Sequence, residues 1–418
     1  MPAPSSPSSL PAPDAAALAH SERLVRRIRD EIEGAGGWIP FVRYMDLALY
    51  APGLGYYAGG AAKFGGAGDF VTAPELTPLF GRTLARVVAQ VLARSGGDLL
   101  ELGAGSGRLA VDMLLELERL ACLPERYLIL EVSPDLRARQ RQLLAEQASH
   151  LLPRVAWLDA LPDRLRGVIL GNEVLDALPA HLLHGSAEGV LERGVVWTQA
   201  GFAWADRPVA SPDLAEAVAR LPLATLALDG HSGASRNPET SAEGTAAYAG
   251  VTGSFSYLCE INLAAPALIA SLADRLECGL LLFLDYGYPR AEYYHPQRHM
   301  GTLRAHYRQH ALDDPFFLPG LADLTAHVDF SAVARAGQEA GLDLLGYTSQ
   351  ANFLMDAGIL ELMLEMEPMT PPYLRAATAV QRLLQPSEMG ELFKAIALGR
   401  GVAGELPGFR RGDRRAAL

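Results

Sequence analysis

Short apolar runs and stretches with helical spacing alternate through the middle of the 418-residue chain. The apolar runs predict strands at 98–102, 127–130, 155–158, 168–170, 280–284 and 392–398. Apolar residues spaced as on one face of a helix predict helices at 109–120, 136–148 and 261–276. Alternation of this kind is typical of an α/β protein with a parallel-rich sheet covered by helices on both faces.

The N-terminal part of the chain does not continue this alternation. It begins with residues rich in Pro, Ser and Ala, and we expect a disordered tail over 1–20. Leu24, Ile28 and Ile32 then recur every four residues and predict one helix. The stretch 39–57 is rich in glycine and aromatic residues, which favours an ordered loop region.

Three further segments lie outside the regular pattern. Thr72 and Glu75 have the spacing of a capping box and predict a helix from there to about residue 93. β-type runs occupy 182–204, after the fourth predicted strand. The stretch 229–254 is rich in Gly, Ser, Ala and Thr and has no period, so we expect an insertion loop there.

Composition narrows the class of protein. Hydrophobic residues make up 50% of the chain and charged residues 20%, which excludes a mostly disordered protein. The formal net charge of -12 disfavours non-specific binding to nucleic acid, so we expect no nucleic-acid partner. The 3 cysteines include no CxxC pair, which argues against a disulfide scaffold or a zinc ribbon.

The same inspection gives an expected location. No run of about 18 apolar residues occurs, so we expect no membrane insertion. The N-terminal segment has neither the basic and apolar regions of a secretory signal nor the Arg-rich pattern of a transit peptide. These features predict a cytoplasmic protein.

The sharpest motif is ELGAGSG, which starts at Glu101 between a predicted strand and a predicted helix. Gly103, Gly105 and Gly107 let the backbone approach a ligand closely, and the following helix offers free N–H groups. A dinucleotide-binding loop would need glycine where the chain has Arg108, and no P-loop lysine–serine pair is present. The spacing resembles motif I of class I S-adenosylmethionine-dependent methyltransferases, with a tight turn that binds nothing as the alternative.

Polar residues follow the next three predicted strands. Glu131 follows the second strand, where a carboxylate can accept hydrogen bonds from ribose hydroxyls. The alternative role is a charge at a helix N-terminus, with Ser133 as the helix cap. Asp159, after the third strand, is a candidate for the adenine amino group or a solvated loop residue. Asn172, after the fourth strand, is a candidate for the methionine end of the cofactor.

Glu173 and Asp176 are candidates for the chemistry itself. Their spacing puts both carboxylates on one face of a helical turn. Such a pair suits a cationic guanidinium or amine, which it can orient or relieve of a proton. The alternative is a pair of acids that only complements the dipole of a helix N-terminus.

Methyl transfer from a sulfonium does not require a metal. It is an in-line displacement for which a protein supplies proximity, alignment and removal of water. Two pairs of histidines occur at helical spacing, His295 with His299 and His306 with His310, but neither presents a clean ligand face. We therefore expect no metal site.

Several segments together resemble the MidA-like family of class I methyltransferases, which includes the mitochondrial complex I assembly factor. The resemblance spans about residues 39–400 and rests on GDFVTAPELTPLFG, ELGAGSG, EVSPDLRARQ, NEVLDALPAHLL, LDYGY and DLTAHVDF. It implies a Rossmann-like sheet with additions at the N-terminus and after the fourth strand, and S-adenosylmethionine as methyl donor. Mitochondrial members are linked to symmetric dimethylation of an arginine on a respiratory complex I subunit, which makes a protein arginine the candidate acceptor here.

The motifs and the resemblance together define the predicted site. The predicted catalytic residues are Glu173 and Asp176. The predicted cofactor-binding residues are Glu101, Gly103, Gly105, Gly107, Glu131, Asp159 and Asn172. The predicted substrate-binding residues are Asp69, from the GDF segment of the resemblance, together with Tyr286 and His327. A small-molecule N- or O-methyltransferase and a non-catalytic, cofactor-binding assembly factor are the alternative functions, and a homo-oligomer is compatible with the sequence.

The sequence also predicts a division of the chain. A region covering the active site would follow the tail, and a substrate-side subdomain would interrupt the methyltransferase core. The expected parts are a tail at 1–20, the covering region at 21–95, the core at 96–181 and 277–400, the inserted subdomain at 182–276, and a C-terminal tail at 401–418.

Overall fold

The computed structural model describes residues 10–59, 72–186, 189–221, 256–402 and 404–418. The strands of its largest sheet lie in the order β15 (Asp343–Ser349), β16 (Phe393–Arg400), β10 (Leu276–Tyr288), β5 (Leu165–Asn172), β2 (Asp98–Leu102), β3 (Tyr127–Leu130) and β4 (Val155–Leu158), with β14 (Val328–Asp329) paired to β10. The strands β10, β5, β2, β3 and β4 pair in parallel, whereas β16 is antiparallel to both of its neighbours. This doubly wound order confirms the expected Rossmann-like class I methyltransferase sheet.

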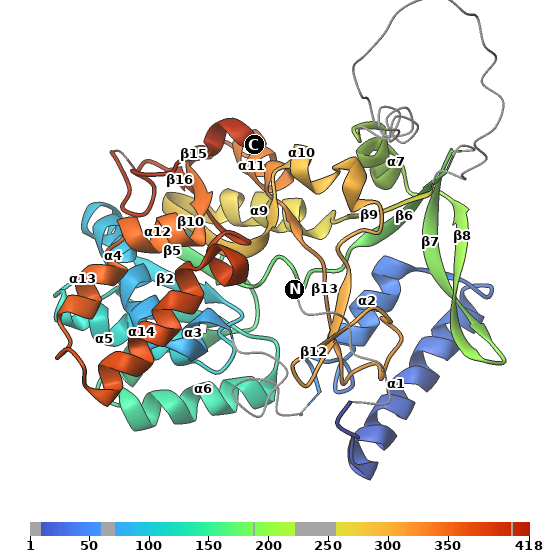
Figure 1. Ribbon diagram of the computed structural model, residues 1–418, viewed down its shortest axis with the longest axis horizontal. Helices are drawn as coiled ribbons and strands as arrows, with labels where there is room; N and C mark the ends of the chain where they lie inside the picture. Colours follow the sequence, from blue (N-terminus) through green and yellow to red (C-terminus); the bar gives the residue numbers. More distant parts are fainter. Residues whose placement is uncertain (1–9, 60–71, 187–188, 222–255, 403) are drawn as a thin grey trace, which may run out of the picture.

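Helices cover both faces of this central sheet (Figure 1), because its strands are apolar on both sides. In β2, Leu99 packs into one apolar core, and Leu100 and Leu102 pack into the other. The first core is closed by α4 (Pro78–Ser95), α5 (Arg108–Arg119), α6 (Pro134–Gln147), α12 (Gln350–Asp356), α13 (Ile359–Leu364) and α14 (Pro371–Leu384). The second core is closed by α9 (Ala264–Arg275) and α11 (Phe330–Glu339).

A second, antiparallel sheet lies to one side of the central sheet (Figure 1). Its strands are β1 (Ile39–Pro40), β7 (Gly189–Thr198), β6 (His181–Ser186), β9 (Ser256–Ile261) and β8 (Gly201–Pro208). A third sheet consists of β12 (His310–Leu312), β11 (Arg304–Tyr307) and β13 (Asp323–Thr325). The helices α1 (Ala15–Gly34) and α2 (Phe41–Tyr50) join these sheets through one apolar cluster that includes Leu24, Tyr44 and Leu324.

Two predictions for the N-terminal region are wrong. The expected disordered tail overlaps α1, which begins at Ala15 because the Asp14 side chain accepts a hydrogen bond from the N–H of Ala17 (2.8 Å). The expected loop at 39–57 contains the helix α2. Its buried residues fall on one face, but the glycines and tyrosines that follow α2 hid this period in the sequence.

The predicted capping box at Thr72 also fails. The helix α3 (Ala73–Leu76) is a single turn, and the Thr72 side chain makes no capping hydrogen bond. Thr77 caps α4 instead, since its hydroxyl accepts the N–H of Leu79 (3.3 Å). Pro78 at the first helical position fits this start, because its missing N–H would have no partner there.

The remaining predicted elements are present: the strands at 98–102, 127–130 and 155–158 have the predicted bounds, and the others have shifted ends. The β-type runs at 182–204 correspond to β6, β7 and β8. β10 is longer than the predicted run at 280–284, because its polar ends still pair with neighbouring strands. The predicted insertion loop at 229–254 and the predicted site residue Asp69 lie outside the described residues. No helix in the described part of the chain is both long enough and apolar enough to cross a membrane.

Candidate active site

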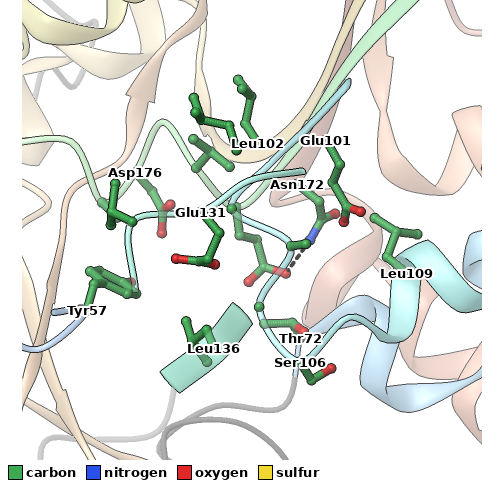
Figure 2. Close-up of a pocket in the computed structure, with 18 of the residues that line it drawn as sticks. Tyr57, Thr72, Glu101, Leu102, Ser106, Leu109, Glu131, Leu136, Asn172 and Asp176 are labelled. Atoms are coloured by element: carbon green, nitrogen blue, oxygen red, sulfur yellow. Dashed lines mark hydrogen bonds between the residues drawn. The ribbon is translucent and has the colours of Figure 1, made fainter. Parts of the chain in front are cut away.

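A cavity of about 310 Å³ lies at the carboxyl ends of β2, β3, β5 and β10. Glu101 and Ser106 reach it from β2 and the turn that follows, Glu131 from the end of β3, and Asn172 and Asp176 from the end of β5 and beyond (Figure 2). After β2 the chain continues to β3, towards one edge of the sheet, whereas after β5 it continues to β10, towards the other edge. The gap between β2 and β5 is therefore the switch point of the strand order. Open α/β sheets bind ligands at such switch points.

The turn after β2 presents bare backbone to this cavity. Gly103, Gly105 and Gly107 all have positive φ angles, of 60°, 52° and 87°. Gly103 and Gly105 line the cavity, while Gly107 caps the start of α5 and does not line it. A Cβ atom on Gly107 would lie 3.2 Å from Gln140. The turn therefore needs glycine both for its backbone angles and for its contact with α6.

Glu131 is held firmly at the end of β3. It is 5% exposed, and its carboxylate accepts hydrogen bonds from the N–H of Ser133 (2.9 Å) and from Nε2 of Gln140 (3.1 Å). Burial raises the pKa of Glu131, while these donors act in the opposite direction. The side chain of Ser133 caps α6 by accepting the N–H of Leu136 (3.4 Å), so the capping role belongs to Ser133.

Glu101 also lines the cavity, but its carboxylate has a partner inside the protein. The hydroxyl of Tyr127 donates to Oε2 of Glu101 at 2.6 Å. Burial raises the pKa of Glu101 to about 7, and the hydrogen bond from Tyr127 opposes this shift.

The turn after β5 carries a half-buried acid, Glu173, and a buried acid, Asp176, in a strained backbone. Glu173 has a φ angle of 54°, which is unfavourable for a residue with a side chain. Oδ2 of Asp285, at the end of β10, accepts the N–H groups of Val174 (3.1 Å), Leu175 (2.8 Å) and Asp176 (3.3 Å). This carboxylate, itself fully buried, thus holds the turn in its shape.

The two acids of this turn have unusual protonation equilibria. Burial raises the pKa of Glu173 to about 8, and the neighbouring Asp176 raises it further. Burial raises the pKa of Asp176 to about 6, although the Tyr286 hydroxyl donates a hydrogen bond to it. Asn172 donates from Nδ2 to Oε1 of Glu173 (3.0 Å; Figure 2). Oδ1 of Asn172 and Oδ1 of Asp176 are buried and have no hydrogen-bond partner among the described residues.

The far wall of the cavity comes from the N-terminal region and β13. Tyr50, at the end of α2, stacks on Tyr57 with ring centroids 5.5 Å apart. The Tyr57 hydroxyl donates to Oδ2 of Asp323 at 2.9 Å, and the Tyr50 hydroxyl donates to the carbonyl of Ala177 at 3.1 Å. Asp323 is 3% exposed, so the far wall adds one more buried carboxylate to the cavity.

The charge of the cavity has one sign. Its described lining contains acidic side chains and neither lysine nor arginine. The acidic residues are Glu75, Glu101, Glu131, Glu173, Asp176 and Asp323. A wall of this kind attracts a cation and repels an anionic substrate.

The structure does not bring all the predicted site residues together. Asp159 has a side chain that is 91% exposed and pairs with Arg137 (2.7 Å), and it does not line the cavity, as expected for a solvated loop residue. His327 is buried against the rings of Tyr286 and Tyr288 and does not line the cavity. Burial lowers the pKa of His327 to about 3, which leaves it neutral. Tyr286 does line the cavity.

Sequence reasoning missed several residues of the site. Tyr50 and Tyr57 lie in the segment read as a loop, and Asp323 lies about 150 residues beyond the fourth strand, so no local pattern links them to the cavity. Asp285 follows the predicted strand at 280–284, at the ligand edge of the sheet, but of this segment only Tyr286 was included in the predicted site. Within the described residues, no group of three or more His, Cys, Asp or Glu side chains is arranged to hold a metal ion.

Comparison with known proteins decides the family. Residues 79–348, more than half of the chain, match the model of a family described as S-adenosyl-L-methionine-dependent methyltransferases. The chain belongs to this methyltransferase family. The enzyme therefore uses S-adenosylmethionine as its methyl donor, as the ELGAGSG turn predicted.

Individual relatives agree with this assignment. The mitochondrial protein arginine methyltransferase NDUFAF7 homolog of Drosophila melanogaster is 30% identical, over 93% of this chain and 88% of its own. Mitochondrial protein arginine methyltransferase NDUFAF7 of Danio rerio is 29% identical, over 87% and 84%. A protein from Burkholderia thailandensis, whose crystal structure has S-adenosyl-homocysteine bound, is 49% identical in sequence. The match covers 98% of this chain and 100% of that chain, with a TM-score of 0.87.

The relatives also correct one prediction. Their names describe mitochondrial proteins, which contradicts the predicted cytoplasmic location. That prediction rested on the lack of a long apolar run and on the composition of the N-terminal segment, and neither feature identifies a compartment.

Proposed function

We propose that this methyltransferase transfers its methyl group to an arginine side chain of a protein. The observation that carries the proposal is the charge of the cavity, whose described lining has six acids and no basic residue. A guanidinium group is a cation with several donors in one plane, and carboxylates are its strongest partners. The names of the relatives, which are protein arginine methyltransferases, support the same acceptor.

The residues at one end of the cavity fit the methyl donor. S-adenosylmethionine, when bound, supplies a methyl group that is activated by a positively charged sulfur. The bare turn at Gly103 and Gly105 can approach it closely, and Glu131 offers a carboxylate edge suited to vicinal hydroxyls. The unpartnered Oδ1 of Asn172 suits an ammonium donor such as that of the methionine end.

The turn after β5 is proposed to hold the acceptor. Glu173 and Asp176 would bind the guanidinium, and the unpartnered Oδ1 of Asp176 would gain a donor from it. An arriving cation lowers the pKa of both acids and so ionises them. Tyr286 orients Asp176 through its hydroxyl, and Asp285 fixes the turn.

The same acids are proposed to handle the proton. A guanidinium nitrogen is a weak nucleophile while its charge is delocalised, and two flanking carboxylates localise that charge away from one nitrogen. As the new N–C bond forms, that nitrogen releases a proton, and an acid with a pKa near neutrality can accept it. The stacked rings of Tyr50 and Tyr57 keep water away from this end of the cavity.

The test is a methyl-transfer assay with the purified full-length chain. Labelled S-adenosylmethionine is incubated with arginine peptides, beginning with sequences from respiratory complex I subunits, and with matched peptides in which lysine replaces arginine. We expect methylarginine from the arginine peptides and no label on the lysine peptides. A mitochondrial extract then reveals the natural acceptor by mass spectrometry. Label found only in small molecules, or in methyl-lysine, would overturn the proposal.

A further inference from the structure

The side chain of Gln140, on α6, joins two parts of the cavity that lie far apart in the sequence. Gln140 is fully buried. Its Nε2 donates to the carbonyl of Gly105 in the turn after β2 (2.9 Å) and to Oε2 of Glu131 at the end of β3 (3.1 Å). A side-chain amide has two N–H groups, so this residue uses its full donor capacity on these two acceptors.

The orientation of the amide is fixed by a third contact. Nε1 of Trp157, on β4, donates to Oε1 of Gln140 at 2.8 Å. An indole N–H can only donate, so the amide oxygen must face Trp157 and the NH₂ group must face the cavity. Arg141 covers the Trp157 ring at 4.6 Å, which further restricts the indole.

The backbone of the glycine turn lies in close contact with α6 at Gln140. A Cβ on Gly107 would lie 3.2 Å from the Cα and Cγ atoms of Gln140 and 3.3 Å from its Cβ. Gly107 does not line the cavity, so the third glycine of the motif is required by its own φ angle of 87° and by the close approach of α6 at Gln140. The turn, Gln140 and Glu131 form one connected unit.

We infer that Gln140 is a positioning residue for S-adenosylmethionine: its amide sets the distance between the glycine turn and the Glu131 carboxylate. The inference rests on the proposed role of Glu131 in cofactor binding. With both N–H groups of Gln140 engaged, the Glu131 carboxylate, which also accepts the N–H of Ser133, and the backbone of the turn line the cavity in one fixed arrangement. Loss of the amide would free the turn and the carboxylate to move independently.

Other groups around Glu131 also affect its pKa. The pH dependence of cofactor binding therefore gives a second measurement. Arg137 lowers its pKa, and its Nε donates to the Glu131 carbonyl (2.6 Å). Glu101, on β2, and Tyr50, on α2, face it from the other elements. The hydrogen bond from Gln140 lowers the pKa of Glu131, so its removal should raise that pKa. Binding that needs the ionised carboxylate would then weaken at a higher pH than in the wild-type enzyme.

The experiment measures the dissociation constant of S-adenosylmethionine by calorimetry, as a function of pH, for Gln140→Leu and Gln140→Glu. Leucine removes the amide at similar size. Glutamate keeps an acceptor for Trp157 and removes both donors, so it carries the test if the leucine variant unfolds. We expect roughly tenfold weaker binding for both variants, since each loses hydrogen bonds to a charged group and to the turn. For the leucine variant, we also expect the loss of binding on the acidic side of the pH profile to begin at a higher pH than in the wild type.

The matched control is Gln142→Leu, the same substitution on the same helix. Gln142 is exposed, and its Nε2 donates to Oε1 of Glu146 on the helix surface (2.9 Å). Its binding constant and pH profile should equal those of the wild type. Thermal unfolding of the ligand-free proteins checks that each variant is folded.

The Glu131→Gln variant separates this inference from the proposed role of Glu131. If Glu131→Gln binds as the wild type does, that proposed role fails and the inference fails with it. If Glu131→Gln binds weakly but Gln140→Leu and Gln140→Glu bind normally, only the inference fails. The inference also predicts that the effect of Gln140→Leu shrinks in the Glu131→Gln background, because the two residues act as one unit. Additive effects would assign Gln140 a merely structural role.

Discussion

The two ends of the cavity differ in how the protein satisfies the hydrogen-bonding groups of their acids. At the proposed cofactor end, Glu131 has protein donors on both oxygens, and the glycine turn is tied to it through Gln140. At the proposed acceptor end, Glu173 and Asp176 lie close together in a strained turn, and Oδ1 of Asp176 has no partner in the described protein. One end is preorganised by satisfied hydrogen bonds, and the other retains an unsatisfied hydrogen-bond acceptor on Asp176.

This difference fits two kinds of ligand. A cofactor is recognised in the same way at every turnover, so rigid and fully bonded contacts favour it without further reorganisation. An acceptor must bind as a cation and lose a proton, so it needs acids whose pKa values can change during the reaction. The pKa values of Asp176, about 6, and Glu173, about 8, lie in the range where this is easiest. The comparison can be tested by changing one end at a time.

The largest effect is expected from the double variant Glu173→Gln/Asp176→Asn. Removal of both acids should lower kcat by about 10²–10⁴-fold, because general-base and charge-localising roles are lost together. The dissociation constant of S-adenosylmethionine should stay unchanged, since the cofactor end is intact. The control is Asp213→Asn/Glu216→Gln, an acid pair of the same spacing on α7 (Pro212–Ala219), which should keep full activity. A double variant that methylates at the wild-type rate would remove the catalytic assignment.

The next effect concerns the cofactor end. Gly105→Val should weaken S-adenosylmethionine binding by about tenfold or more, because a side chain at a φ of 52° is strained and would also enter the cavity. Gly36→Val tests strain alone, since Gly36 has a φ of 76° in an exposed turn with nothing within 4 Å of its Cβ position. Calorimetry on both variants makes the comparison. Equal binding by the two would show that the turn does not touch the cofactor.

A smaller effect is expected from the far wall. Tyr57→Phe removes the hydroxyl that orients Asp323 and should raise the acceptor KM by roughly threefold to tenfold. Cofactor binding should not change. Tyr373→Phe, on α14, is the matched control, since its ring does not line the cavity. A rise in the cofactor dissociation constant, instead of the acceptor KM, would contradict the division into two ends.

The smallest effect concerns stability. Because the pKa of Glu173 is raised from 4.5 to about 8 in the folded protein, folding favours its protonated form. Its unfavourable contribution is absent below the unfolded pKa and grows as pH rises towards 8. Glu173→Gln should therefore raise the thermal unfolding temperature at pH 8 by more than it does at pH 5. An equal change at both pH values would mean that Glu173 is ionised throughout.

The same comparison explains what the sequence could predict. Glu101, Gly105 and Glu131 lie within one strand–helix–strand unit, where local apolar pattern and glycine spacing determine position. Glu173 and Asp176 were found because they follow another core strand. Tyr57 and Asp323 were missed because tertiary packing alone brings α2 and β13 to the cavity. Asp159 was misplaced because a residue after a strand can point to solvent as readily as to a ligand.

The helix α2 shows a further reason for failure. Its face of buried residues packs against β6, β7 and β13, which are distant in sequence, so tertiary contacts and not local signals define it. Gln140 is similar, because a lone glutamine on a polar helix gives no sign that it faces inward. The predicted division of the chain into covering region, core and inserted subdomain stays a prediction, which limited proteolysis can test.

The most direct test of the two-ended site is a crystal structure with S-adenosylhomocysteine and an arginine peptide bound together. The account predicts sugar hydroxyls on Glu131 beside the glycine turn, and the guanidinium between Glu173 and Asp176. A guanidinium bound elsewhere, or a nucleoside that leaves Glu131 without a contact, would contradict it.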